Sequence, residues 1–273
     1  MKKEMLTPEW LRAIEEWLSS LVVAGRTIAT IELRFYQVRR FACGVGGEPG
    51  SVTSRRLVAW LAGHAWGSDT MRSHVSALRE FFSWAAATGL IEHDPSVGLP
   101  CPRATRHAPR PAPGSAVRAG LRQPATRVRA MVALAALQGL RRGEIARVHM
   151  KHLVPDLAGT SLWVQGKGGK QRLIPLREDV LALIRAEGQS GWLFPNNQKG
   201  GHLSEAHVGK LIRRALPAQW TAHTLRHHFG TVVYSKTKDL LAVQELLGHA
   251  SPQTTKGYVQ VPTPALRAAV ESV

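Results

Sequence analysis

The sequence predicts a mainly α-helical protein that contains one small β-sheet and divides into two domains. Its 273 residues favour two domains, since a typical domain has about 150. Apolar residues recur at intervals of three and four residues over much of the chain, as they do in amphipathic helices. Two short runs of β-forming residues, 161–165 and 171–176, flank the glycine-rich turn GKGGK and indicate a β-hairpin.

Residues 1–100 are predicted to form a domain of four helices. The first begins after the capping residue Thr7, with Pro8 in its first turn, and the fourth runs from about Ser68 to the break at Gly89. The residues expected to face the core recur at helical spacing. They are Trp10, Ile14, Trp17, Leu18 and Leu21 in the first helix, Ile28, Ile31, Phe35 and Val38 in the second, Leu57, Val58 and Leu61 in the third, and Met71, Val75, Leu78, Phe82 and Ala85 in the fourth.

Positive charge is concentrated after this first domain. The chain carries 36 Lys and Arg against 19 Asp and Glu, a net charge of +17, yet residues 1–100 are nearly neutral. The segment 101–130 holds seven arginines and no acid, and its first part is rich in proline. We therefore expect residues 101–115 to form a basic linker, either simply solvated or following a phosphate backbone, before a second domain at 116–273.

The composition favours a polyanion as partner over the alternatives of a membrane surface or solubility alone. No apolar run approaches the roughly 18 residues of a membrane span, and the first residues lack a signal-peptide core. Cys43 and Cys101 lie far apart and fit no zinc spacing, so we expect a reduced, intracellular protein.

The second domain is predicted to contain helices near 128–135, 178–186, 204–216, 223–234 and 239–247. Three segments concentrate polar groups among apolar residues: QGLRRGE (138–144), HTLRHHFGT (223–231) and LLGHASPQTTKGYVQV (246–261).

In the middle segment, His223 and Arg226 are three residues apart and therefore share one face of a helix. Taken singly, an Arg, His or Tyr in such a place is more often a solvated or packed structural residue than a functional one. A zinc site formed by His223, His227 and His228 is disfavoured, because no zinc-binding spacing is present.

Together and in this order, the segments resemble the tyrosine recombinases, the phage-integrase and Xer-like group. The matching boxes are GLRRGE, GKGGKQRLIPL, HTLRHHFGT, LLGH and TTKGYVQV, and the first domain adds the pattern LREFF…GLI…DP. The intervals also agree with the family: 3 residues from His223 to Arg226, 23 from Arg226 to His249, and 9 from His249 to Tyr258.

The resemblance implies that Arg141 and Arg226 clamp the scissile phosphate of DNA, with a further hydrogen bond from His249. Two guanidinium groups suit this task because each binds phosphate oxygens bidentately and stabilises the negative charge that in-line attack builds up. Two positions depart from the family pattern, Gln138 in place of Thr and Gly143 in place of Ser or Thr. Neither carries the reaction, and we interpret both as local packing differences.

The resemblance also implies that Tyr258 attacks the phosphate and forms a 3′-phosphotyrosine link. His223 would assist proton transfer from its phenol, whose ordinary pKa is about 10. Lys167 would be the general acid that protonates the departing 5′ oxygen, although Lys170 is close enough in the same turn to take this role. The covalent link conserves the energy of the broken bond, so no ATP, metal or other cofactor is expected.

Tyrosine is scarce enough to narrow the choice of nucleophile. The chain has only three, Tyr36, Tyr234 and Tyr258. We expect Tyr36 to lie on a core-adjacent face of the first domain and Tyr234 to pack at the end of its helix. Tyr258 remains as the candidate.

The resemblance assigns residues 1–100 to a SAM-like four-helix core-binding domain and residues 116–273 to a catalytic domain with a carboxy-terminal tail helix. Both would hold double-stranded DNA. Polar residues at the start of the fourth helix either enter a groove or are ordinary solvated side chains. The candidate DNA contacts are Arg34, Thr70, Arg72, Ser73, Arg79, Arg103, Arg106 and Arg110.

In this family two protomers bind each site, four form the synapse, and strands exchange through a Holliday junction. Accessory DNA-bending or directionality factors are further candidate partners. The tail carries an apolar stripe that packs either on its own core or on a neighbouring subunit, formed by Leu266, Ala269, Val270 and Val273.

The chain is expected to start directly with the core-binding domain, without the arm-binding module of larger phage integrases, which leaves two biological roles open. We expect the role of a compact phage or mobile-element integrase, because the sequence is shorter and richer in arginine than that of a housekeeping enzyme. It would act in the cytoplasm of a bacterial or phage-infected cell, at the nucleoid. An Xer-like resolvase of chromosome or plasmid dimers is the alternative. A type IB topoisomerase, which uses a similar residue set, and a catalytically inactive DNA-binding regulator are less favoured.

Overall fold

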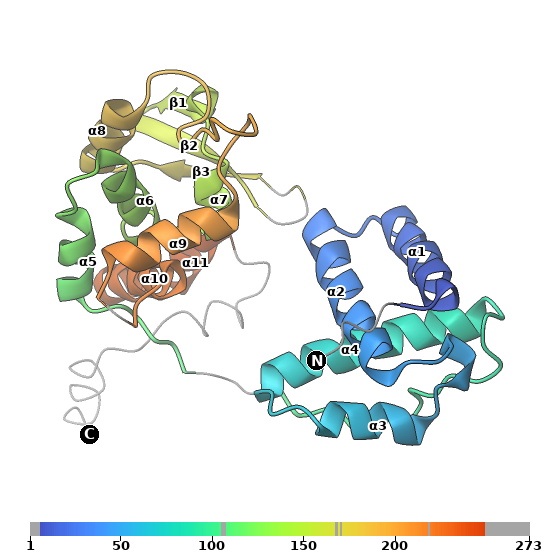
Figure 1. The fold of residues 1–273 in the computed structure, drawn as a ribbon. Coiled ribbons are helices and arrows are strands. Elements are labelled where there is room, and N and C mark those ends of the chain that lie inside the picture. Colours follow the sequence, from blue (N-terminus) through green and yellow to red (C-terminus); the bar gives the residue numbers. More distant parts are fainter. Residues whose placement is uncertain (1–5, 105–107, 167–168, 170, 218, 249–273) are drawn as a thin grey trace, which may run out of the picture. The chain divides into compact units, whose positions relative to one another are not determined.

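The computed structural model describes residues 6–104, 108–166, 169, 171–217 and 219–248, and the chain forms two compact units, Met1–Arg106 and His107–Val273 (Figure 1). The described part of the chain is mostly helical and contains one three-stranded sheet, which confirms the predicted fold class. Within these residues, no helix is long and apolar enough to cross a membrane.

The first unit contains four helices around an aromatic core, as predicted. Its elements are α1 (Pro8–Val23), α2 (Ile28–Val45), the short 3-10 helix η1 (Pro49–Ser51), α3 (Ser54–Ala62) and α4 (Ser68–Ala87). The Thr7 side chain caps α1 by accepting a hydrogen bond from the Trp10 backbone N–H. Trp10 packs against Phe41, Phe81 and Phe82, and these four rings are fully buried.

The predicted inward face of α2 is confirmed at Val38, which is buried, and at Ile31, which packs against the core, but it is wrong at Ile28 and Phe35. Ile28 is 76% exposed and Phe35 is 38% exposed, whereas Val38, Phe41 and Ala42 are buried. The helix carries apolar residues on two sides. Its buried residues are Gln37, Val38, Phe41 and Ala42, and the partly buried Arg34 lies one turn before Val38 on the same side. Arg34 is therefore only 17% exposed and pairs with Glu80 at 2.9 Å.

The second unit packs helices around the antiparallel sheet β1-β2-β3. Its elements are α5 (Gly114–Leu121), α6 (Thr126–Ala136), α7 (Arg142–Ala146), η2 (Met150–His152), β1 (Leu153–Asp156), β2 (Gly159–Gln165), β3 (Gln171–Pro175), α8 (Glu178–Glu187), α9 (Glu205–Ala215), α10 (Ala222–Thr237) and α11 (Leu240–Leu247). Residues 130–136 of α6 are all buried, and α5, α8, α9 and α10 surround this helix (Figure 1).

The predicted linker is shorter than expected, because its second half belongs to the second unit. Ala112 is buried, its N–H donates to the Thr224 carbonyl at 2.9 Å, and its own carbonyl lies 2.8 Å from His228 Nδ1. Helix α5 begins at Gly114. A proline-rich segment thus docks on α10 by backbone hydrogen bonds, which composition alone does not reveal.

Candidate active site

Arg141 is presented by a tight turn between α6 and α7. Gly139 adopts a positive φ of 68°, and a Cβ placed there would lie 2.4 Å from Phe229 Cδ1. Only glycine has the left-handed conformation and the small size that this position needs. The turn therefore packs directly against Phe229 of α10. Arg141 then stands at the N-cap of α7, three residues before the buried Glu144.

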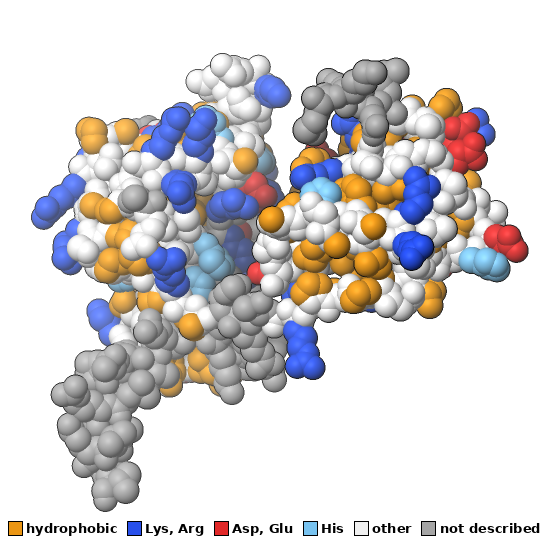
Figure 2. Space-filling model, turned by 60° about the horizontal axis from the view of Figure 1, so that its bottom comes forward, with side chains coloured by type: hydrophobic (Ala, Val, Ile, Leu, Met, Phe, Trp, Pro, Cys, Tyr) orange, Lys and Arg blue, Asp and Glu red, His pale blue; other side chains and the backbone are white. Residues whose placement is uncertain are grey.

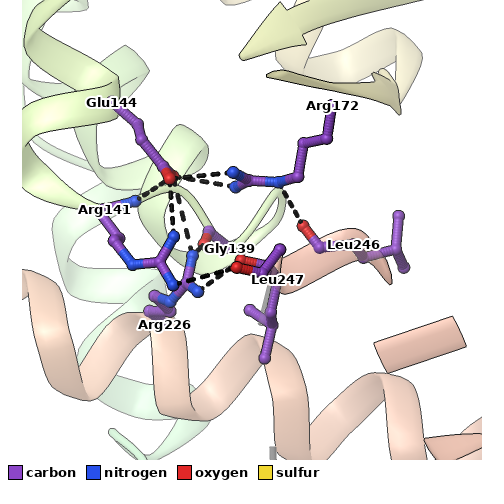
Figure 3. A network of polar contacts seen from close by, with 8 residues as sticks. Gly139, Arg141, Glu144, Arg172, Arg226, Leu246 and Leu247 are labelled. Atoms are coloured by element: carbon purple, nitrogen blue, oxygen red, sulfur yellow. Dashed lines mark hydrogen bonds and ion pairs between the residues drawn. The ribbon is translucent and has the colours of Figure 1, made fainter. Parts of the chain in front are cut away.

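Glu144 is the centre of a network of three arginines (Figure 3). Arg141 donates to it twice, from its backbone N–H to Oε2 at 2.8 Å and from Nη1 to Oε1 at 2.8 Å. Arg172, on β3, donates from Nη1 to Oε1 and from Nη2 to Oε2, both at 2.9 Å. Arg226 of α10 approaches Oε2 at 3.7 Å. One carboxylate therefore brings together the two arginines predicted as the phosphate clamp.

The charge state of Glu144 follows from these neighbours. Burial raises the pKa of Glu144, but the hydrogen bonds and charge of Arg172, the Arg141 N–H and the charge of Arg226 outweigh it and lower the pKa to about 2. Glu144 is therefore ionised at pH 7 and compensates part of the positive charge around it.

Arg226 is nearly inaccessible to solvent, with 1% of the residue exposed. It donates from Nη1 to the Gly139 carbonyl and from Nη2 to the Leu247 carbonyl at 2.6 Å. Arg141 Nη2 donates to the next carbonyl, that of Gly248, at 3.4 Å. Backbone carbonyls of the turn before α7 and of the end of α11 thus hold the two clamp arginines in place.

A cavity of about 740 Å³ opens beside these arginines, and we call it the basic cavity. It is lined by Arg141, Arg142, Gly143, Glu205, Ala206, Gly209, Lys210, Arg213, Thr221, Ala222, His223 and Arg226. Five of its lining side chains are Lys or Arg, and one is an acid. In Figure 2, Lys and Arg side chains are spread over the visible face of the second unit, with histidine between them. The cavity has the charge expected of a site for a phosphodiester backbone.

His223 lines the basic cavity together with Arg226, and the two lie on the same face of α10, as the spacing predicted. Partial burial lowers the pKa of His223, and the positive charges of Arg226, Arg142 and Arg141 lower it further. The imidazole is therefore neutral at pH 7 and able to accept a proton. Its Nε2 lies 3.0 Å from Nε2 of His227.

The remaining predicted catalytic residues lie outside the described residues. These are Lys167, its alternative Lys170, His249 and Tyr258. Of the other tyrosines, Tyr36 is 53% exposed and its hydroxyl accepts a hydrogen bond from Arg40, so the predicted core-adjacent position is wrong. Tyr234 packs, as predicted, against the small apolar cluster of Phe229, Val243 and Leu247.

The candidate DNA contacts of the first unit differ in how far they are engaged. Thr70 is exposed, and Arg72 is 40% exposed beside Asp69 at 3.9 Å. Ser73 accepts a hydrogen bond from Gln37 at 2.7 Å, and Arg79 donates to the Leu99 carbonyl. Arg34, tied to Glu80, Ser73 and Ser76, is turned into the unit. Of these five residues, Arg34, Ser73 and Arg79 are therefore engaged with other parts of the unit, whereas Thr70 is exposed and Arg72 pairs within its own helix.

Three candidate contacts come from the predicted linker. Arg103 is exposed, and Arg106 lies outside the described residues. Arg110 donates to Gln219 Oε1 and stacks over the Trp220 ring at 5.4 Å. The segment is therefore partly fixed to the second unit rather than being wholly free to follow DNA.

Sequence reasoning missed three parts of the site: Glu144, Arg172 and the polar face of α9. Glu144 had a signal, as a single acid among arginines in QGLRRGE. Lys210 and Arg213 are also recognisable, because they alternate with the buried Val208 and Ile212 on an amphipathic helix. Arg172 carried no signal, since its partners lie 28 and 74 residues away along the chain.

Local packing explains the two departures from the family pattern, Gln138 and Gly143, as expected from the sequence. Gln138 donates from its side-chain amide to the Pro175 carbonyl at 3.2 Å and so joins the turn to the sheet. At Gly143, a Cβ would lie 2.7 Å from Glu205 Oε2 and 3.3 Å from Arg147 Nη2. The space that a Ser or Thr side chain would need is filled by these two residues.

Known proteins resemble the chain over most of its length. Residues 117–263 match the sequence model of the phage integrase family. A tyrosine recombinase XerC from Rhodospirillum centenum is 33% identical over 291 residues, covering 93% of this chain and 84% of the relative.

Two solved structures share the fold. A lambda integrase (75–356) dimer bound to a COC' core site has a TM-score of 0.73 and 19% identity, over 93% of this chain and 95% of that one. A lambda integrase tetramer bound to a Holliday junction has a TM-score of 0.70 and 18% identity, over 88% and 77%.

Proposed function

The chain belongs to the phage integrase family and is a tyrosine recombinase, and we propose that it exchanges strands between specific duplex DNA sites through a 3′-phosphotyrosine intermediate. The observation that carries this proposal is the convergence of Arg141, Arg226 and a neutral His223 on one basic cavity. The two guanidinium groups would stabilise the charge that develops on the non-bridging oxygens, and the imidazole would take up a proton.

The reaction proposed has two balanced steps. In the first, the phenolic oxygen of Tyr258 attacks the scissile phosphorus, its proton passes toward His223, and the bond to the 5′ oxygen breaks as Lys167 protonates that oxygen. His249 would donate a hydrogen bond to the phosphate. In the second step a 5′ hydroxyl from the partner duplex attacks the phosphotyrosine and releases Tyr258. One phosphodiester is formed for each one broken, so the reaction needs no external energy source.

We propose that two protomers occupy each site and four form the synapse, where strands pass through a Holliday junction. The lambda integrase structures, a dimer on a core site and a tetramer on a Holliday junction, support this assembly. A largely apolar cavity of about 420 Å³, bordered by Leu137, Phe229, Val233 and Leu246, offers a surface of matching chemistry for the apolar tail of a neighbour.

The biological role proposed is integration of a phage or mobile element, by an enzyme acting on DNA in the bacterial cytoplasm. The second candidate is an Xer-like resolvase of DNA dimers, which the likeness to XerC favours. The two roles differ in their products. An integrase joins two different sites on separate molecules, whereas a resolvase recombines two copies of one site within a single molecule.

The proposed chemistry is tested with nicked suicide substrates that carry candidate attachment and dimer-resolution sequences. We expect an SDS-resistant adduct joined to a 3′ phosphate, formed in the presence of EDTA and without ATP. Rapid relaxation of a supercoiled plasmid that lacks any such site would contradict the recombinase assignment and indicate a type IB topoisomerase. DNA binding without any adduct, across all the candidate sequences, would indicate an inactive regulator.

The polar face of α9 should contribute directly to DNA affinity. Replacing Lys210 or Arg213 with Ala is expected to weaken binding and to reduce the slope of log K against log salt by about 0.9 for each phosphate contact removed. Arg214 is the matched control, because it is exposed on the same helix but is not among the described residues that line the basic cavity. Equal slopes for the R213A and R214A variants would contradict the placement of DNA in this cavity.

A further inference from the structure

We propose that Arg172 is a positioning residue of the active site. It holds Glu144 and the end of α11 in fixed positions relative to each other and thereby determines the positions of the two clamp arginines, Arg141 and Arg226. This inference rests on the proposed function. Arg172 is not among the described residues that line the basic cavity, and its side chain is only 12% exposed. It therefore acts through other groups rather than by touching DNA.

The first part of the argument is the geometry of the Arg172 guanidinium (Figure 3). Its two Nη atoms meet the two oxygens of Glu144 at 2.9 Å each, a bidentate arrangement that fixes the plane of the carboxylate. The same carboxylate accepts from Arg141 and lies beside Arg226. Its orientation therefore determines where both clamp arginines stand.

The second part is the end of α11, where three successive carbonyls each accept from a different arginine. Arg172 Nε donates to Leu246 at 3.0 Å, Arg226 donates to Leu247, and Arg141 donates to Gly248. The last carbonyls of a helix have no partner within it and carry partial negative charge, so guanidinium groups stabilise them. The residues immediately after Gly248 include His249, so this anchor sets where the chain leaves the helix.

The third part is the close approach of Arg172 to Gly248. Gly248 has a φ of 64° and ends α11, and a Cβ placed on it would lie 2.8 Å from Arg172 Cδ and 2.9 Å from Nη1. Glycine is required here for the left-handed conformation and for the space that Arg172 occupies. The same arginine lies on β3, which follows Lys167 and Lys170 in the sequence. Arg172 thus joins β3 to the end of α11, after which His249 and Tyr258 follow in the sequence.

The test compares Arg172→Ala and Arg172→Lys with the full-length wild type on the nicked substrate. We expect the cleavage rate to fall about 100-fold in R172A, since misplacement of reacting groups by about 1 Å has this effect, while DNA affinity stays within about threefold. R172K keeps the charge but loses the bidentate fork and should recover only a small part of the rate. Arg185→Ala, an exposed arginine on α8, is the control and should cleave normally.

Two further readouts separate positioning from a general loss of folded protein. On a substrate with a neutral methylphosphonate at the scissile position, the R172A defect should shrink to less than tenfold, because less charge then needs the clamp. Adding Gly248→Ala should slow the wild type about 100-fold, through the clash with Arg172 and the left-handed backbone strain together. In R172A the added effect should be smaller, since only the backbone strain remains. Equal defects on both substrates, or fully additive effects of the two changes, would overturn the inference.

Hydrogen exchange tests the anchor without DNA and so separates this inference from the proposed function. In R172A, the amides of α11 should exchange at least tenfold faster, while those of the buried α6 should be unchanged. Unchanged α11 protection would overturn the positioning role even if the wild type cleaves DNA. Absence of an adduct in the wild type, with the expected change in exchange, would overturn the proposed chemistry and leave the anchor standing.

Discussion

Replacing Tyr258 with Phe should abolish the covalent protein–DNA adduct while leaving DNA binding within about twofold of the wild type. The phenolic oxygen is the atom that forms the bond to phosphorus, so its removal eliminates the step rather than slowing it. We expect adduct formation to fall by at least about 10⁴-fold, as for other enzymes that lose their nucleophile. The measurement is SDS gel analysis of a trapping reaction in which the cleaved strand is labelled at its 5′ end, which stays with the protein, and binding is followed in parallel by gel shift.

The other two tyrosines are matched controls for this experiment. Tyr36 belongs to the first unit, and its hydroxyl accepts from Arg40 at 3.1 Å. Tyr234 lies eight residues after Arg226 on α10, which places it about 12 Å further along the helix, in an apolar cluster. Tyr36→Phe and Tyr234→Phe should both form adduct at the wild-type rate. Adduct in Y258F, or its loss in either control, would show that another residue attacks the phosphate.

The sequence predicted those features that depend on residues only a few positions apart. The cap of α1 at Thr7 is one example, and the shared face of His223 and Arg226 is another, because three residues of helix are enough to define each. The inward face of α2 was partly wrong because apolar residues occupy two sides of this helix, and its packing against α1, α3 and α4 selects between them. The strand β1 was missed because its four residues, LVPD, show no alternation of apolar and polar side chains.

The parts of the site that escaped prediction depend on contacts between distant segments. Motif spacing identified Arg141 and Arg226 but gave no reason for their relative position, which Glu144 supplies. The Arg172–Leu246 hydrogen bond joins residues 74 positions apart, and no periodicity encodes such a pair. The excess of positive charge was evident from composition. That five of these basic side chains line one cavity, formed by α7, α9 and α10, required the fold.

Replacing Glu144 with Ala should destabilise the second unit by about 3–5 kcal/mol, the typical effect of removing one partner from a buried ion pair. Arg226 and Arg172 would then remain 1% and 12% exposed without the carboxylate that compensates them. Glu144→Gln keeps the shape and one acceptor oxygen but loses the charge, so it should lie between the wild type and E144A. Hydrogen exchange of α6 measures this unit separately from the first.

The stabilisation by Glu144 should also depend on pH, with a sign fixed by its lowered pKa. Folding lowers that pKa from 4.5 to about 2, so the contribution is complete above pH 4.5 and is lost as the pH falls toward 2. The change amounts to roughly 3 kcal/mol, from about 1.4 kcal/mol for each pH unit. E144Q cannot titrate here and should lose correspondingly less stability over this interval.

Glu178→Gln is the matched control, because it makes the same chemical change on an exposed side chain of α8. It should leave both the stability at pH 7 and its decline toward pH 2 within about 0.5 kcal/mol of the wild type. If E144Q lost stability with acid as steeply as the wild type, other carboxylates would account for the decline. The three arginines would then be held by their backbone carbonyls rather than by Glu144, and the clamp would not depend on this carboxylate for its geometry.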